Sequence, residues 1–200
     1  MELFTPSPQK PARLGILAGT FNPPTRAHIA LAEAALARVD HVLLVIPGQL
    51  PHKTWEGASL PQRVDMLRQV AGERVSAAVS EGGLYIDMVR EARSLYPDAD
   101  IYVVCGRDAA ERIATWDYGE ADAFEGMLSE FRMLVAARRG TWQFPAHLAH
   151  AVEHLDAGCW DDYSSTAVRD ALAAGQAWRE LVPASLHEVV EEIYRAHFRR

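Results

Sequence analysis

Cysteine is scarce in this chain of 200 residues: only Cys105 and Cys159 occur, and they have no metal-ligand spacing. The sequence therefore gives no sign of a disulfide framework, and we expect a reducing compartment, the cytoplasm. Long hydrophobic runs are missing too, since a run such as "VLLVI" is far too short to span a bilayer. The leader "MELFTPSPQKPAR" lacks the apolar segment of a secretory signal. We expect residues 1–12 to form a flexible tail before a single domain at 13–200.

Positive charge is also in short supply. Lys and Arg number 20 against 27 Asp and Glu, which gives a formal net charge of -7. This balance argues against nucleic-acid binding, so an anionic ligand would have to be held by local donors and helix ends. The chain has no G-x-G-x-x-G after its first apolar segment and no G-K-[ST] step. These absences disfavour a dinucleotide-dependent dehydrogenase and a P-loop NTPase.

Short β-branched segments alternate with longer amphipathic ones. Such alternation, with nearly continuous apolar strands, is typical of a parallel sheet covered on both faces. We therefore predict an α/β fold, a Rossmann-like doubly wound parallel sheet with C-terminal helices. The expected strands are 14–18, 41–46, 74–79, 100–105 and 132–137, and the expected helices are 26–38, 60–71, 86–96 and 108–115.

After residue 140 the pattern predicts helices alone. "SSTAVRDALAAG" and "PASLHEVVEEIYRAH" are the two expected terminal helices, the first ended by Gly175. The stretch "HLAHAVEH" would place His147, His150 and His154 on one helical face, but no nearby Cys or carboxylate completes a metal site. We therefore expect no protein-bound metal.

Polar stretches follow four of the expected strands. They are "GTFNPPTRAH", "PGQLPHK", "GRD" and "RRG". The carboxyl ends of parallel strands share one edge of the sheet, where ligands bind in open α/β sheets. Each stretch alone reads as a solvated loop, but four on one edge indicate a binding site.

The first of these stretches places Thr25 and His28 at the start of a helix. Gly19 allows close approach of the backbone to a ligand, and the free N–H groups and dipole of the helix suit phosphate. Residues three apart share a helix face, so a hydroxyl and an imidazole could both donate to phosphate oxygens. The bland alternative is an N-cap threonine beside a partly buried histidine.

A second phosphate motif lies in "YSSTAVRDAL". Ser164, Ser165 and Thr166 stand at a helix start, and Arg169 follows one turn later. A cap needs only one hydroxyl, so three hydroxyls and an arginine indicate a phosphate cradle.

These two motifs resemble the (H/T)-x-x-H and S-S-T-x-x-R signatures of the nucleotidylyltransferase superfamily. "PHK" at 51–53, "GRD" at 106–108, Trp116 and "LVPASLHEVVEEIY" are similar to the nicotinate-mononucleotide adenylyltransferase branch. The resemblance runs from about Leu14 to Tyr194. It implies transfer of AMP from ATP, with Mg²⁺, to a pyridine mononucleotide, with release of pyrophosphate.

The resemblance also implies roles for individual residues. The catalytic set would be His28, Thr25, Lys53 and Arg169. ATP would be bound by Gly19, Thr20, Phe21, Gly106, Asp108, Ser164, Ser165 and Thr166. The acceptor would be bound by Tyr85, Trp116 and Arg138, with Trp116 stacked on the pyridine ring.

One segment departs from the branch. Where the branch has Tyr-Thr-x-Asp-Thr, this chain has Leu84 to Met88, with Asp87 in register. We expect backbone amides near Tyr85 to bind the pyridine carboxylate, and acid to be preferred over amide more weakly than in the branch. Two alternatives stay open: a sister enzyme with another phosphorylated acceptor, such as phosphopantetheine, and a nucleotide-binding sensor without turnover. The sequence leaves the oligomeric state open.

Overall fold

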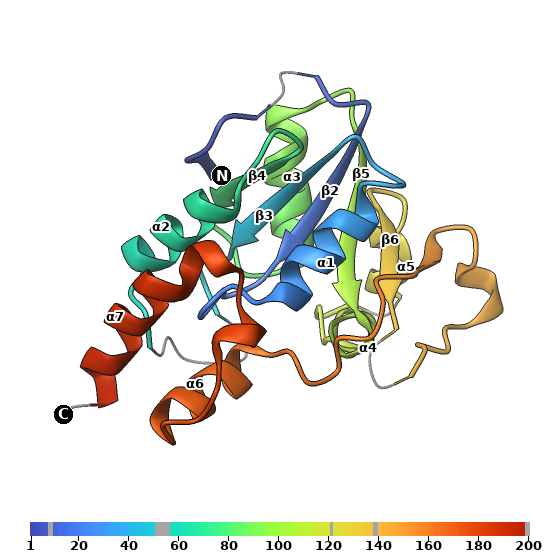
Figure 1. Cartoon of the computed structure of the whole chain (residues 1–200). Coiled ribbons are helices and arrows are strands. Elements are labelled where there is room, and N and C mark those ends of the chain that lie inside the picture. The colour runs from blue at the N-terminus through green and yellow to red at the C-terminus, as the bar shows by residue number, and fades with distance from the viewer. Residues whose placement is uncertain (8–9, 51–56, 121, 138–139, 199–200) are drawn as a thin grey trace.

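The computed structural model describes residues 1–7, 10–50, 57–120, 122–137 and 140–198. Within these residues, seven strands form one sheet in the order β1-β4-β3-β2-β5-β6-β7 (Figure 1). Strand β1 is antiparallel to β4, and the other neighbouring strands are parallel. The strands are β1 (Glu2–Leu3), β2 (Arg13–Ala18), β3 (His41–Ile46), β4 (Val75–Val79), β5 (Asp100–Gly106), β6 (Arg132–Ala136) and β7 (Val152–Leu155).

Helices cover both faces of this sheet, which confirms the predicted doubly wound α/β fold (Figure 1). No described helix is long and apolar enough to cross a bilayer. The α-helices are α1 (Arg26–Ala35), α2 (Leu60–Val70), α3 (Tyr85–Leu95), α4 (Arg107–Thr115), α5 (Ala123–Met127), α6 (Ser165–Ala173) and α7 (His187–Phe198). Short 3-10 turns lie at Ala146–Leu148, Arg179–Leu181 and Ala184–Leu186.

Strand β3 shows why the apolar runs are continuous. All six of its residues are buried. Leu43 and Val45 pack into a core with α3 and α4, while Val42, Leu44 and Ile46 pack into a second core with α1 and α2. Side chains alternate between the faces of a strand, so a strand covered on both sides is apolar at nearly every position, here at all but His41.

A third apolar cluster joins the C-terminal helices to α2. Met66 of α2, Val168 of α6 and Val190 and Tyr194 of α7 are buried together. Figure 1 shows α7 lying beside α2, with α6 below them. This cluster holds the end of the chain against the edge of the sheet where the first loop emerges.

Two local predictions about helix ends are confirmed. Ser59 and Gln62 form the expected capping box of α2, with the Ser59 N–H donating to Gln62 Oε1 at 2.8 Å. Helix α6 ends just before Gly175, whose φ of +66° lies in the left-handed region that favours glycine.

The expectation of a loose N-terminal tail is wrong for the first residues. Glu2 and Leu3 pair with Val79 and Ala78 of β4, and the Phe4 N–H donates to the Ala77 carbonyl at 3.1 Å. An edge strand as short as this is held by backbone hydrogen bonds, which leave no side-chain pattern in the sequence.

The prediction of helices alone after residue 140 is also wrong. Val152–Leu155 forms β7, which extends the sheet parallel to β6. His147 lies in a 3-10 turn and His154 in this strand, so the three histidines do not share a helical face. No cluster of metal-ligating residues occurs among the described residues.

Candidate active site

A cleft of about 470 Å³ opens at the carboxyl ends of β2, β5 and β6. Gly19, Gly106 and Ala136, which follow or end these strands, all line it. Strand β2 lies between β3 and β5, where the order of the strands reverses. In open α/β sheets this switch point is where two loops diverge and leave a crevice for ligands.

The first wall of the cleft is the loop that joins β2 to α1. The Gly19 N–H is held by the Val45 carbonyl at 3.0 Å. Phe21 has a φ of +44°, a conformation that is rare for residues other than glycine. Its ring lies under Gly19, where an added Cβ would come within 3.3 Å of it, and 5.1 Å from the His28 ring. The Phe21 ring is thus buried beneath the loop and is not among the residues that line the cleft, and its contact with ATP stays a prediction.

Thr25 and His28 form a unit at the start of α1. The Thr25 N–H donates to His28 Nδ1 at 3.0 Å, and the Thr25 hydroxyl lies 2.7 Å from the same nitrogen. A backbone N–H can only donate, so Nδ1 is an acceptor without a proton. The neutral imidazole therefore carries its proton on Nε2.

This geometry separates the two residues that the sequence treats alike. His28 lines the cleft, whereas Thr25 is fully buried. The expectation that both side chains donate to phosphate is wrong for Thr25, whose hydroxyl is engaged by the imidazole. Thr25 instead fixes the orientation and the tautomer of His28.

The opposite wall is the N-terminal turn of α6. Ser164, Ser165, Thr166 and Arg169 all line the cleft. The Ser164 hydroxyl caps the helix by accepting from the Ala167 N–H at 3.0 Å. Arg169 donates to Thr166 Oγ1 at 3.3 Å, which turns its guanidinium along the first turn.

Direct hydrogen bonds join the two motifs. The Ser165 hydroxyl donates to the Pro23 carbonyl at 2.8 Å, and Arg169 Nη1 donates to the Asn22 carbonyl at 2.7 Å. Residues more than 140 positions apart thus meet across one cleft. The starts of two helices, α1 and α6, therefore meet at one cleft.

The third wall begins where β5 ends. Gly106 and Asp108 line the cleft, and so does Arg112, one turn further along α4. Sequence reasoning missed Arg112, although its spacing of four residues from Asp108 places both on one helix face. A fourth wall of aromatic rings was missed as well. Trp160 and Tyr163 line the cleft just before the serine motif, with ring centroids 4.8 Å apart.

Small side chains accompany these rings. The Trp160 Nε1–H donates to the Ala157 carbonyl at 2.6 Å, which fixes the indole against its own loop. Ala136, Ala157 and Gly158 line the same part of the cleft. A flat apolar surface beside a row of polar donors suits a planar base attached to phosphates.

Other expected site residues lie elsewhere. Trp116 follows α4 directly and is half-buried, and Tyr85 donates its hydroxyl to the Ala18 carbonyl at 3.3 Å; neither belongs to the lining of this cleft. Burial raises the pKa of the Tyr85 phenol well above its usual value, so this group stays protonated. Lys53 and Arg138 fall outside the described residues. Cys105 is buried as expected, and burial raises the pKa of its thiol to about 12.

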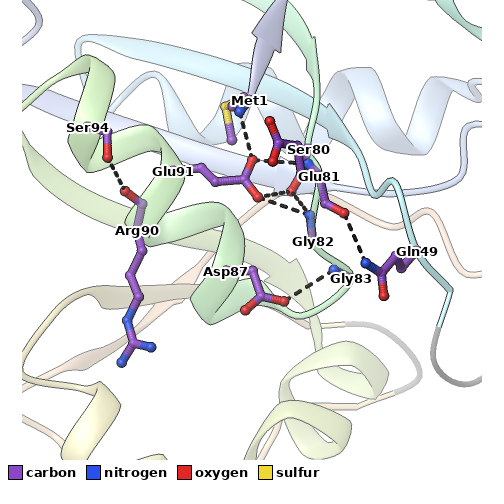
Figure 2. A network of polar contacts seen from close by, with 10 residues as sticks. All are labelled: Met1, Gln49, Ser80, Glu81, Gly82, Gly83, Asp87, Arg90, Glu91 and Ser94. Carbon is purple, nitrogen blue, oxygen red and sulfur yellow. Dashed lines mark hydrogen bonds and ion pairs between the residues drawn. The ribbon is translucent and has the colours of Figure 1, made fainter.

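The loop between β4 and α3 is held by two carboxylates of α3 (Figure 2). Glu91 accepts from the N–H groups of Glu81 at 3.2 Å and Gly82 at 3.0 Å. Asp87 accepts from those of Gly83 at 3.2 Å and Leu84 at 3.0 Å. Four consecutive amides are therefore engaged within the protein, and the expectation that amides near Tyr85 bind a pyridine carboxylate is wrong for these four.

The same loop is joined to the loop after β3. The N–H groups of Gly48 and Gln49 donate to the Gly82 carbonyl at 3.0 and 3.4 Å. An added Cβ at Gly48 would come within 2.3 Å of the Ser80 carbonyl oxygen, and one at Gly82 within 2.3 Å of Asp87 Cβ. Only glycine fits this close approach, so the two loops form one fixed edge.

Comparison with known proteins agrees with this geometry. The cytidylyltransferase-like family model matches residues 16–171, which contain both phosphate motifs. The chain belongs to the cytidylyltransferase-like family. Two relatives of this family member are both named "Probable nicotinate-nucleotide adenylyltransferase". The protein of Gloeobacter violaceus is 36% identical, with 92% of this chain and 94% of that protein covered. The protein of Citrifermentans bemidjiense is 33% identical, with 90% and 96% covered.

Solved structures show the same fold. The nicotinic acid mononucleotide adenylyltransferase of Plasmodium falciparum complexed with NaAD matches with a TM-score of 0.68, at 15% identity, over 92% of this chain and 95% of that one. The same enzyme complexed with APC matches with a TM-score of 0.63, at 16% identity, over 93% and 96%.

Proposed function

We propose that this protein is a nucleotidyltransferase that moves the AMP moiety of ATP to nicotinate mononucleotide, or less well to its amide form. The products are the dinucleotide and pyrophosphate, as in NAD biosynthesis, for which the cytoplasm is the expected place. The observation that carries the proposal is the meeting of His28 with Ser165 and Arg169 in one cleft. The names of the relatives supply the acceptor.

The reaction needs positioning more than acid–base chemistry. A phosphate oxygen of the acceptor attacks the α-phosphorus of ATP, a new P–O bond forms, and the bond from the α-phosphorus to the bridging oxygen breaks. Pyrophosphate leaves with the electron pair of that bond. The attacking oxygen is already anionic, so no general base is required, and catalysis comes from orientation and stabilisation of moving charge.

His28 is placed to stabilise this charge. Thr25 holds its Nδ1, so we assign to the Nε2–H the hydrogen bond to a phosphate oxygen. Arg169 and the hydroxyls of the α6 start would hold the remaining phosphate oxygens, as charge-assisted hydrogen bonds are the strong ones. Lys53 would add a further cation from the segment after β3.

Mg²⁺ fits this cleft as a companion of ATP. Asp108 is the carboxylate among the described lining residues, and Mg²⁺ is often held by one carboxylate with substrate phosphates and waters. When bound, the ion would neutralise phosphate charge during the transfer. Asp108 could instead accept from a ribose hydroxyl, as the resemblance implies.

The β4–α3 loop bears on the choice between acid and amide. With the amides of residues 81–84 engaged, the donors for a carboxylate are those of the first turn of α3 itself. Leu84 and Met88 add no polar side chain to this wall. We therefore expect the acid to be preferred, but modestly. The same observation favours the second candidate, a nucleotidyltransferase for another phosphorylated acceptor.

The deciding experiment is a pyrophosphate-release assay with ATP and Mg²⁺. Nicotinate mononucleotide, its amide form and phosphopantetheine are the acceptors, and mass spectrometry identifies the product. Formation of the nicotinate dinucleotide, lost in His28→Ala, supports the proposal. Turnover with phosphopantetheine alone supports the sister enzyme, and ATP binding without turnover on any acceptor supports a sensor.

A further inference from the structure

Arg63 is a buried cation at the cleft that none of the motifs contains. It lies on α2 beside Met66 and Leu67, on the face of the helix that packs inward. Only 1% of the residue is exposed, yet it belongs to the lining of the cleft. A charged side chain is rarely buried to this extent unless its contacts satisfy it.

The contacts of Arg63 hold the first loop. Its Nε donates to the Ala58 carbonyl at 2.7 Å, and its Nη1 donates to the Thr20 carbonyl at 2.8 Å. Thr20 lines the cleft next to Gly19, so the guanidinium is fixed directly behind the loop that faces the ligand.

Two positive charges are thereby brought to the same end of the cleft. Burial lowers the pKa of the Arg63 guanidinium most; Tyr194 raises it, and the charge of Arg169 lowers it, because the two cations repel. Arginine is not deprotonated in proteins at neutral pH, so the guanidinium keeps its charge. An anion between the two guanidiniums would relieve this repulsion.

The surrounding contacts make the arrangement rigid. The Tyr194 hydroxyl donates to Asn22 Oδ1 at 2.6 Å, and the Ala58 N–H donates to the same oxygen at 3.1 Å. Gly57 has a φ of +65°, and a Cβ there would lie 2.7 Å from Asn22 Oδ1. The loop is therefore held rigidly, and the charge of Arg63 is fixed in place before a ligand arrives.

We propose that Arg63 is a positioning residue that supplies a fixed positive charge behind the first loop and favours the polyphosphate of ATP in the adjacent part of the cleft. The proposal rests on the proposed function only in that the cleft binds a nucleoside triphosphate. The sequence signal was an arginine on the apolar face of an amphipathic helix, between Gln62 and Val64.

The test uses inorganic pyrophosphate as the probe, with binding measured by calorimetry on the full chain. Arg63→Met removes the charge, and Arg63→Lys keeps it while changing the hydrogen bonds. Arg68→Met is the matched control, because Arg68 is on the same helix but exposed and paired with Asp65. We expect Arg63→Met to weaken pyrophosphate binding by about tenfold or more, and Arg63→Lys and Arg68→Met to stay within about threefold of the parent.

Two results would overturn the proposal: a folded Arg63→Met that binds pyrophosphate like the parent, or an Arg63→Lys as weak as Arg63→Met. If Arg63→Met does not fold, Arg63→Gln, which keeps one donor, is tested with the same expectation. If neither folds, a folded Arg63→Lys with parental affinity supports the charge role, and a loss of about tenfold contradicts it.

The proposed function can fail separately. A parent that binds pyrophosphate with this dependence on Arg63, but forms no dinucleotide, would refute the acceptor and keep the inference. A parent that does not bind pyrophosphate at millimolar concentration would refute the inference.

Discussion

Replacement of His28 by alanine tests the chemistry of the cleft most directly. In the parent, the Thr25 N–H at 3.0 Å and the Thr25 hydroxyl at 2.7 Å hold His28 Nδ1, so the Nε2–H is fixed before substrate binds. A donor fixed in this way costs no reorganisation during the reaction. Loss of one such donor lowers kcat by roughly 10²–10³, equivalent to about 3–4 kcal/mol of transition-state stabilisation.

The partner residue provides a graded comparison. Thr25→Val removes the hydroxyl but keeps the backbone N–H that donates to Nδ1, so the tautomer of His28 is preserved. We expect this variant to lose about tenfold or less in kcat, which corresponds to the usual net value of one neutral hydrogen bond. In the double variant the two losses should not add, because Thr25 acts through His28.

The assay is steady-state turnover at saturating ATP and nicotinate mononucleotide, with Mg²⁺. Thermal unfolding of each variant provides the control for folding. His28 lies on α1 and is half-buried, so its truncation should leave a folded protein. A folded His28→Ala within about tenfold of the parent in kcat would refute its role in stabilising charge.

Four further results are expected. Burial lowers the pKa of His41 from 6.5 to about 4, so as the pH falls the unfolded chain takes up a proton on His41 before the folded protein does. The free energy of unfolding should therefore fall by about 3 kcal/mol between pH 6.5 and pH 4. A free energy of unfolding that stays constant over this range would contradict the prediction. Burial alone would raise the pKa of Glu91, but hydrogen bonds from the Gly82 N–H, the Met1 amino group and Ser80 hold it below 4.5. Glu91→Gln should therefore lower Tm at neutral pH, and the difference in Tm from the parent should shrink as the pH falls through the acidic range. Trp160→Ala should raise the KM for ATP by about tenfold through loss of base stacking, and an unchanged KM would exclude the indole from the ATP site. Trp116→Ala should instead raise the KM for the mononucleotide, and a rise in the KM for ATP alone would reverse the assignment.

The sequence was enough to predict which loops meet at the cleft, as far as this depends on the direction of the strands. The carboxyl ends of parallel strands share an edge, so the stretches that begin at Gly19 and Gly106 were expected to meet, and they line one cleft. The sequence could not predict that Thr25 is buried while His28 lines the cleft. Their spacing puts both on one side of the helix start, but only packing decides which of them the core covers.

Sequence by itself determined the features whose causes are local. The apolar run of β3, the capping box at Ser59 and the glycine after α6 each follow from a few adjacent side chains. Even the two phosphate motifs are local, because hydroxyls and helix amides next to one another suit phosphate wherever they lie.

Tertiary structure alone decided where distant segments meet. Strands β1 and β7 pair through backbone groups, which every residue has, so their short segments gave no pattern to read. Trp160, Arg112 and Arg63 became cleft residues only because the chain returns to the end of β2. The amides of residues 81–84 looked available until Asp87 and Glu91 folded back on them (Figure 2). A hydrogen bond depends on distance and angle in space, and neither is contained in the order of residues along the chain.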